Sequence, residues 1–134
     1  YVSGTAIELM NPSDNVLRAG LTPKYIDAEE LIKVLGERQD APVLQRPAVN
    51  DSGVEQYAMW DERMSVQHIR VLADKPVEYT FEGTSAALVV DGSVTISVGE
   101  QNITLRGTES VLHAGDATSA TITGEGELYI ARYV

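Results

Sequence analysis

Residues 94 to 105 read VTISVGEQNITL. Valine and isoleucine alternate with threonine and serine over the first five positions. A period of two places the apolar side chains on one face of a strand, so the pattern predicts a half-buried strand. Residues 77 to 81 (VEYTF) repeat it, and residues 128 to 134 supply a last strand. Short strands at this spacing predict a mainly β chain folded as an antiparallel β-sandwich, for which the jelly roll is the natural candidate.

Glycines mark the expected reversals of the chain. Asp91 and Gly92 form a dipeptide typical of a tight hairpin and directly precede the strand just described. Further turns are predicted at Gly107, at Gly115 and at the Gly124–Gly126 stretch. These signals divide the second part of the chain into short strands.

One short helix is predicted near residues 27 to 36. Asp27 is a good N-cap residue, and Glu30 follows it at the spacing of a capping box. An apolar stripe runs from Leu31 to Leu35, and Gly36 is suited to end the helix.

The pattern of residues along the chain changes once, near residue 38. Residues 1–38 contain a strand, a polar loop and the helix, whereas residues 39–134 form the β-sandwich, after a crossing loop over residues 39 to 53. We expect the two parts to make a single compact domain. Because apolar residues begin at Tyr1, we also expect the chain to continue from a region upstream, as a fragment of a larger protein.

Composition excludes several classes of function. The 134 residues include no cysteine, which removes disulfides, thiolate metal sites and cysteine nucleophiles. With 20 acidic against 10 basic residues, the net charge is −10, which disfavours binding to nucleic acid. No apolar run approaches the ~20 residues of a membrane span, and no signal peptide is visible. These features fit a cytoplasmic protein.

Residues 13 to 24 read SDNVLRAGLTPK and concentrate binding groups on one loop. Arg18 offers planar paired donors and Lys24 a compact charge, which together could hold a phosphorylated or polyhydroxylated ligand. Asp14 could accept a proton or a sugar hydroxyl. The alternative is structural: Arg18 pairs with Asp14 four residues earlier, and Asp14 and Asn15 satisfy backbone donors in a local turn.

The same run, preceded by residues 1–4 and 8–10 and followed by Tyr25-Ile26-Asp27, closely resembles the signature of type I mannose-6-phosphate isomerases. Beyond residue 38 the resemblance is one of layout. It implies a cupin fold, which is a jelly-roll sandwich. It also implies a zinc-dependent isomerase that interconverts mannose 6-phosphate and fructose 6-phosphate through a cis-enediol, with a sugar phosphate as substrate.

The resemblance implies a role for each matching residue. Arg18 would be the active-site arginine that stabilises charge on the enediol or steers the substrate, and Asp14 would lie near the reacting carbons and transfer protons. Lys24 would bind phosphate, Asn15 would shape the loop, and Tyr1 would line the site beside a metal ligand.

The zinc site is expected outside this chain. Members of the family hold one zinc ion with a glutamine, a glutamate and two histidines, all upstream of the position that matches Tyr1. His68 and His113 are 45 residues apart and show no ligand spacing, so both are predicted to be structural or surface residues. The isolated chain is therefore expected to be inactive without the upstream catalytic region of the same protein.

Two other functions are compatible with a cupin. One is a non-catalytic module for sugar binding or association, because a fold does not determine function. The other is a different cupin enzyme, such as an epimerase or a nucleotidyltransferase with a type II isomerase domain. That class would carry its metal histidines as a His-x-His cluster within the cupin motif, which this sequence lacks.

Overall fold

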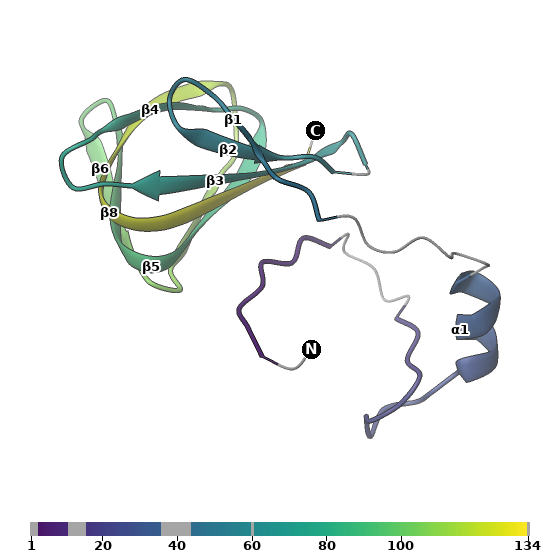
Figure 1. Ribbon diagram of the computed structural model, residues 1–134. Coiled ribbons are helices and arrows are strands. Elements are labelled where there is room, and N and C mark those ends of the chain that lie inside the picture. Colours follow the sequence, from purple (N-terminus) through teal and green to yellow (C-terminus); the bar gives the residue numbers. More distant parts are fainter. Residues whose placement is uncertain (1–2, 11–15, 36–43, 60, 134) are drawn as a thin grey trace. The chain divides into compact units, whose positions relative to one another are not determined.

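The computed structural model describes residues 3–10, 16–35, 44–59 and 61–133 (Figure 1). The chain divides into two units, Tyr1–Leu44 and Gln45–Val134, and each is described by itself. The first unit holds the helix, and the second holds the strands. No helix in these ranges is long and apolar enough to cross a membrane.

Helix α1 spans Ala28–Leu35. The Asp27 carboxylate accepts a hydrogen bond from the backbone N–H of Glu30 at 2.9 Å, which confirms the predicted N-cap. The reciprocal half of the capping box does not form. The Glu30 carboxylate contacts Lys33 Nζ at 3.3 Å instead, and the backbone N–H of Asp27 donates to the carbonyl oxygen of Arg18 at 3.2 Å.

The apolar stripe of α1 is exposed. No residue of the helix is buried within the described structure, and Ile32, Val34 and Leu35 all lie at the surface. An amphipathic helix of this length gains most of its stability from packing its apolar face. Gly36, the predicted end of the helix, lies outside the described residues.

The second unit is built from eight antiparallel strands (Figure 1). Their bounds are β1 Ala48–Val49, β2 Val54–Tyr57, β3 Met64–Val71, β4 Val77–Phe81, β5 Thr84–Val98, β6 Gln101–Arg106, β7 Ser110–His113 and β8 Thr118–Tyr133. The short strand β1 falls inside the segment expected to be a crossing loop, so that part of the prediction was wrong at Ala48–Val49.

Strands β5 and β8 are long enough to belong to two layers. They pair with each other from Thr84↔Tyr133 to Ser97↔Thr121. Strand β7 pairs with the first half of β5 and β3 with the last half of β8, whereas β6 and β4 pair with the other two halves. The result is two sheets, β1-β2-β3-β8-β5-β7 and β4-β8-β5-β6, that share two bent strands. The predicted antiparallel sandwich is confirmed.

The core lies between these two layers. The alternation read from residues 94 to 98 is confirmed at Val94 and Ile96, whose side chains are buried. The most completely buried large side chains come from strands β3, β5 and β8 and are Ile69, Val71, Val89, Val94, Ile122, Leu128 and Ile130. A continuous apolar interior of this kind supplies most of the free energy that stabilises a sandwich.

Two of the turns predicted at glycines are wrong. Asp91-Gly92 lies inside β5 and Gly124–Gly126 lies inside β8, where Gly92 pairs with Gly126. At Gly92 the φ angle is 81°, and a Cβ built there would lie 2.1 Å from the carbonyl oxygen of Glu125. The glycines therefore allow two strands to bend and cross at close range, next to a bulge between Val89 and Asp91. The same backbone freedom serves a hairpin, so the local sequence does not separate the two uses.

The actual reversals fall at other glycines. Gly99, with a φ of 57°, begins the two-residue connection between β5 and β6. Gly107 precedes Thr108, whose φ of 72° is positive, in the turn between β6 and β7, and Gly115 lies between β7 and β8. The turns predicted at Gly107 and Gly115 are confirmed.

Tyr79 is expected to make the sandwich less stable at alkaline pH. It lies half-buried on β4, where its hydroxyl donates to the side-chain oxygen of Gln67, and burial raises its pKa above the ordinary value. The unfolded chain then releases the phenol proton more readily than the folded one. We expect the contribution of Tyr79 to the free energy of unfolding to be constant below the unfolded pKa of about 10 and to fall as pH rises above it.

The test compares urea unfolding at pH 7 and at pH 10.5. Tyr79→Phe should reduce this loss of stability, while costing about 1 kcal/mol at pH 7 because Gln67 loses its partner. Burial also raises the pKa of Tyr57 and Tyr129, so part of the alkaline loss should persist. Tyr25→Phe, at an exposed tyrosine, is the control and should leave the loss unchanged. An equal loss in Tyr79→Phe and the parent would show that Tyr79 is not its source.

Candidate functional site

The loop that precedes α1 is closed by one backbone hydrogen bond. The carbonyl oxygen of Arg18 accepts from the N–H of Asp27 at 3.2 Å, while the carboxylate of Asp27 caps the helix. Arg18 is therefore tied to the first turn of α1, although nine positions separate the two residues. As a whole, the residue Arg18 is partly buried. An arginine held on an ordered backbone and partly shielded from water is well placed to bind an oxyanion.

Between its two ends the loop carries a strained residue. Leu21 has a φ of 51°, in the left-handed region that leucine rarely adopts, and its side chain is fully exposed. The hydroxyl of Thr22 accepts from the N–H of Lys24 at 3.2 Å and fixes the turn that follows. Backbone strain at an exposed residue without packing of its own is typical of loops shaped for binding. No signal in the sequence predicted it.

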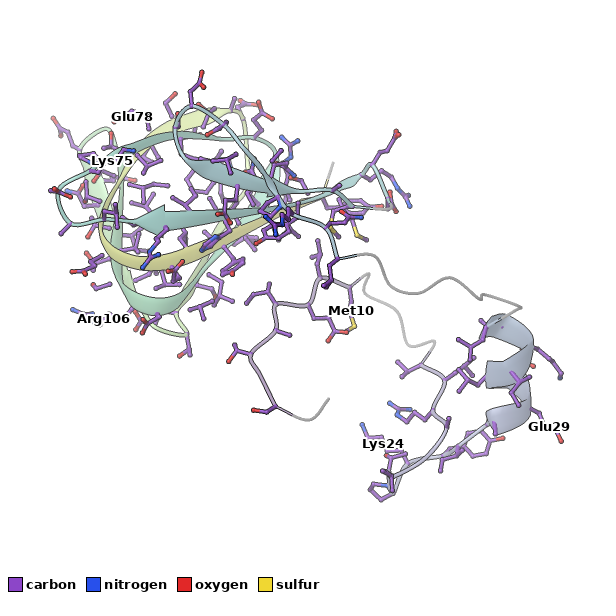
Figure 2. The ribbon with its side chains drawn as sticks, in the orientation of Figure 1. Met10, Lys24, Glu29, Lys75, Glu78 and Arg106 are labelled. Carbon is purple, nitrogen blue, oxygen red and sulfur yellow. The ribbon has the colours of Figure 1, made fainter. Side chains whose placement is uncertain are left out.

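Lys24 lies on this loop with its side chain exposed (Figure 2). The ion pairs formed between described residues include neither Lys24 nor Arg18. Both cationic groups lie in one loop closed by a hydrogen bond. Their roles in binding stay predictions.

Three of the predicted site residues lie outside the described structure. They are Tyr1, Asp14 and Asn15. The proton-transfer role of Asp14, the loop-shaping role of Asn15 and the lining role of Tyr1 therefore stay predictions. The alternative pairing of Asp14 with Arg18 also stays a prediction.

The start of α1 is surrounded by acidic groups. Asp27, Glu29 and Glu30 surround the first turn, and the Asp27 carboxylate already accepts from one of its amides. Acidic groups compensate the positive end of a helix dipole. The first turn of α1 is therefore a poor place for a negative ligand, and a role for Arg18 and Lys24 in holding one stays a prediction.

His68 is bracketed by two carboxylates on the outer side of the β2-β3-β8 sheet. Its Nδ1 lies 2.8 Å from an oxygen of Glu55, and its Nε2 forms a hydrogen bond with Glu127. The ring stacks on Tyr129 with 4.6 Å between centroids. These partners lie 13 and 59 residues away along the chain, so no sequence pattern could have revealed them.

His113 is partly buried at the end of β7. Its Nδ1 donates to the carbonyl oxygen of Gly83 at 2.8 Å, since a carbonyl can only accept. Nε2 lies 3.1 Å from the hydroxyl of Thr118, and the ring stacks on Phe81. The imidazole therefore connects β7 to the segments at the ends of β4 and β8.

A zinc site needs three or four ligand side chains that converge on one point. Within residues 3–10, 16–35, 44–59 and 61–133, no group of three or more histidine, aspartate or glutamate side chains is arranged to hold a metal ion. Both histidines form hydrogen bonds with protein partners instead. The described part of the chain does not fit a zinc site.

Comparison with known proteins gives consistent relatives, although no family model matches the chain. Mannose-6-phosphate isomerase from Escherichia coli is 33% identical over 129 residues, which cover 96% of this chain and 33% of the relative. The Salmonella typhimurium enzyme is 35% identical over 139 residues, with the same coverage. The chain spans about a third of the length of the curated relatives it matches.

Solved structures agree with this match. A single-residue variant of phosphomannose isomerase from Salmonella typhimurium superimposes with a TM-score of 0.71 at 25% identity, covering 91% of this chain and 32% of that one. The same enzyme bound to fructose 6-phosphate and zinc gives a TM-score of 0.68. The cupin fold is confirmed by these neighbours. Over nearly its whole length, this chain is homologous to the C-terminal portion of mannose-6-phosphate isomerases.

Proposed function

We propose that the chain is the C-terminal portion of a zinc-dependent isomerase that interconverts mannose 6-phosphate and fructose 6-phosphate through a cis-enediol. The proposal is supported by the identity of 33% over 96% of the chain, and by a solved relative bound to fructose 6-phosphate and zinc. In this reading the chain contributes one loop to an active site whose remaining parts lie upstream.

Arg18 is the residue proposed to act on the reacting atoms. In an aldose–ketose shift, negative charge develops on the oxygens bound to the two carbons between which the proton moves. A guanidinium can donate to both oxygens at once, and donors held in place before the reaction stabilise such charge most effectively. The single observation that carries this role is the bond from the Asp27 N–H to the Arg18 carbonyl, which orders the backbone of a half-buried arginine.

Lys24 is proposed to bind the phosphate of the substrate. Its ammonium is exposed on a loop shaped by the left-handed backbone of Leu21 and by the Thr22 hydroxyl. A compact cation on a flexible stem can follow a phosphate through binding and release. Asp14 is proposed to transfer a proton, and Asn15 and Tyr1 to complete the pocket.

The zinc ion is proposed to be held by residues upstream of this chain. The described residues offer no cluster of ligands, whereas the related enzyme from Salmonella typhimurium binds zinc. All of the chemistry assigned to this chain therefore rests on Arg18, Lys24 and Asp14.

The exposed face of α1 supports an upstream partner within the same protein. Ile32, Val34 and Leu35 form part of an apolar stripe that no described residue buries. Contiguous exposed apolar surface usually marks an interaction site. We propose that the upstream region, which corresponds to about two thirds of each relative, covers this stripe and makes the loop catalytically competent.

The first experiment is a coupled isomerase assay on the full-length protein. We expect turnover of mannose 6-phosphate that disappears with a zinc chelator and returns when zinc is restored. The 134-residue chain alone is expected to show none under the same conditions. A folded, zinc-loaded full-length protein without isomerase activity would contradict the proposal and favour a non-catalytic cupin module.

A further inference from the structure

A second candidate site is an open pocket lined only by residues of the sandwich. A cavity of about 500 Å³ opens between β4, β5, β6 and β7, and nothing in the proposed isomerase reaction uses it. We propose that this cavity binds a small, uncharged and predominantly apolar molecule. The inference is independent of the proposed function, because the cavity shares no residue with the loop that carries Arg18 and Lys24.

The cavity continues the apolar core outward. Phe81 and Ile96 line it and are only 3% and 4% exposed, so they belong to the packed interior. Ile103 pairs directly with Ile96 across β5 and β6, yet it is 42% exposed. Neighbouring Val98 and Leu112 are exposed in the same lining. Val94 and Leu105 pair across β5 and β6 and fill the core. The next pair on the same face, Ile96 and Ile103, lies beside a space that the described chain leaves open.

His113 gives the cavity an aromatic wall rather than an ionic one. Both of its ring nitrogens contact oxygens of the sandwich, those of Gly83 and Thr118, and its ring stacks on Phe81 with 5.4 Å between centroids. An imidazole whose nitrogens are already engaged offers a ligand mainly its face. Flat rings pack well on such surfaces.

The remaining polar groups define the class of ligand. Of the lining side chains only Gln101 and Asn102 carry amides, and none is an aspartate, glutamate, lysine or arginine. A charged ligand would lose its hydration without gaining a counter-ion, which is costly. Small-molecule sites of roughly 300–1,000 Å³ are typically apolar with a few polar groups that orient the ligand. The cavity therefore suits a neutral aromatic or aliphatic molecule and excludes a sugar phosphate.

The test uses the 134-residue chain and the neutral fluorescent probe N-phenyl-1-naphthylamine, whose emission rises in apolar surroundings. We expect saturable binding of one probe per chain. Ile103→Asp should weaken it at least about tenfold, because a carboxylate would stand at the mouth of an apolar space. Ile103→Trp, which fills the space without adding charge, should weaken it as well. Leu72→Asp is the matched control, at 46% exposure outside the cavity, and should stay within about twofold of the parent.

Each other outcome would overturn the proposal. Binding that does not saturate, or that falls equally in Ile103→Asp and Leu72→Asp, would mean that the probe binds exposed apolar surface in general and not this cavity. Light scattering covers a second alternative. If the parent is a dimer, and both Ile103 variants are monomers that bind no probe, the cavity is an interface between two copies. Far-UV circular dichroism of each variant verifies folding. Excess mannose 6-phosphate should displace no probe, which keeps this result separate from that of the isomerase assay.

Discussion

Replacing Arg18 with alanine in the full-length protein is expected to lower kcat/KM for mannose 6-phosphate by roughly 100- to 1,000-fold, the usual effect of removing one donor that stabilises an oxyanion. The effect should fall mainly on kcat if the guanidinium acts on charge that develops in the transition state. The bond from Asp27 N–H reaches the carbonyl of Arg18 and not its side chain. The substitution therefore removes the guanidinium and leaves the closure of the loop in place.

Two further variants make this test specific. Arg18→Lys keeps the charge but loses the paired donors, so its activity should lie between those of the parent and of Arg18→Ala. Arg106→Ala, at the end of β6 and in neither proposed site, should keep the activity of the parent (Figure 2). If Arg18→Ala stays within about threefold of the parent, Arg18 has a structural role such as pairing with Asp14. A rise in KM alone would assign it to substrate binding rather than to the chemical step.

The largest effect on stability is expected from Gly92→Ala. A side chain at a φ of 81° costs roughly 1–2 kcal/mol by itself. The added Cβ would also meet the Glu125 carbonyl oxygen at 2.1 Å and the Cα of Gly126 at 2.6 Å. These are backbone atoms of the paired strand and cannot rotate away, so β5 and β8 would have to separate at their shared bend. We expect this overpacking to add about 1–3 kcal/mol.

Gly53→Ala is the matched control for that prediction. Gly53 has a φ of 79°, and a Cβ built there meets no atom within 4 Å. Urea unfolding of the two variants therefore separates backbone strain from the clash, because both share the strain and only Gly92→Ala has the clash. Equal losses of stability in the two variants would show that the close approach of β5 and β8 contributes nothing. Gly124→Ala, which would place its Cβ 2.3 Å from the Ser93 oxygen, should resemble Gly92→Ala.

The two predictions concern separate parts of the molecule. Gly92 and Gly124 shape the bend by which two long strands serve both layers of the sandwich. Arg18 belongs to the first unit and depends on a local hydrogen bond to the cap of α1. A variant of Gly92 is therefore expected to act on activity only through loss of folded protein, whereas Arg18→Ala should leave the unfolding free energy almost unchanged.

Local features were readable because their causes are local. The N-cap at Asp27 depends on a residue three positions later, and the burial of Val94 and Ile96 depends on a period of two. The loop from residue 13 to residue 24 was singled out by its residue types, and the structure ties Arg18 within it to the helix. Its chemistry could be inferred only from the resemblance, because most of the proposed pocket lies upstream of this chain.

The sequence by itself determined the class of fold, the position of the helix and the segment that carries the candidate site. Only the tertiary structure decided that Gly92 and Gly124 bend strands instead of ending them, that His68 lies between Glu55 and Glu127, and that an apolar cavity opens beside Ile103. The physical reason is how far apart in the sequence the interacting residues lie. A glycine's freedom and an alternating pattern are properties of a few neighbouring residues. The contacts just named follow instead from the pairing of strands, which brings distant parts of the chain together, as in the pairing of β3 with β2 and β8 and of β5 with β6, β7 and β8.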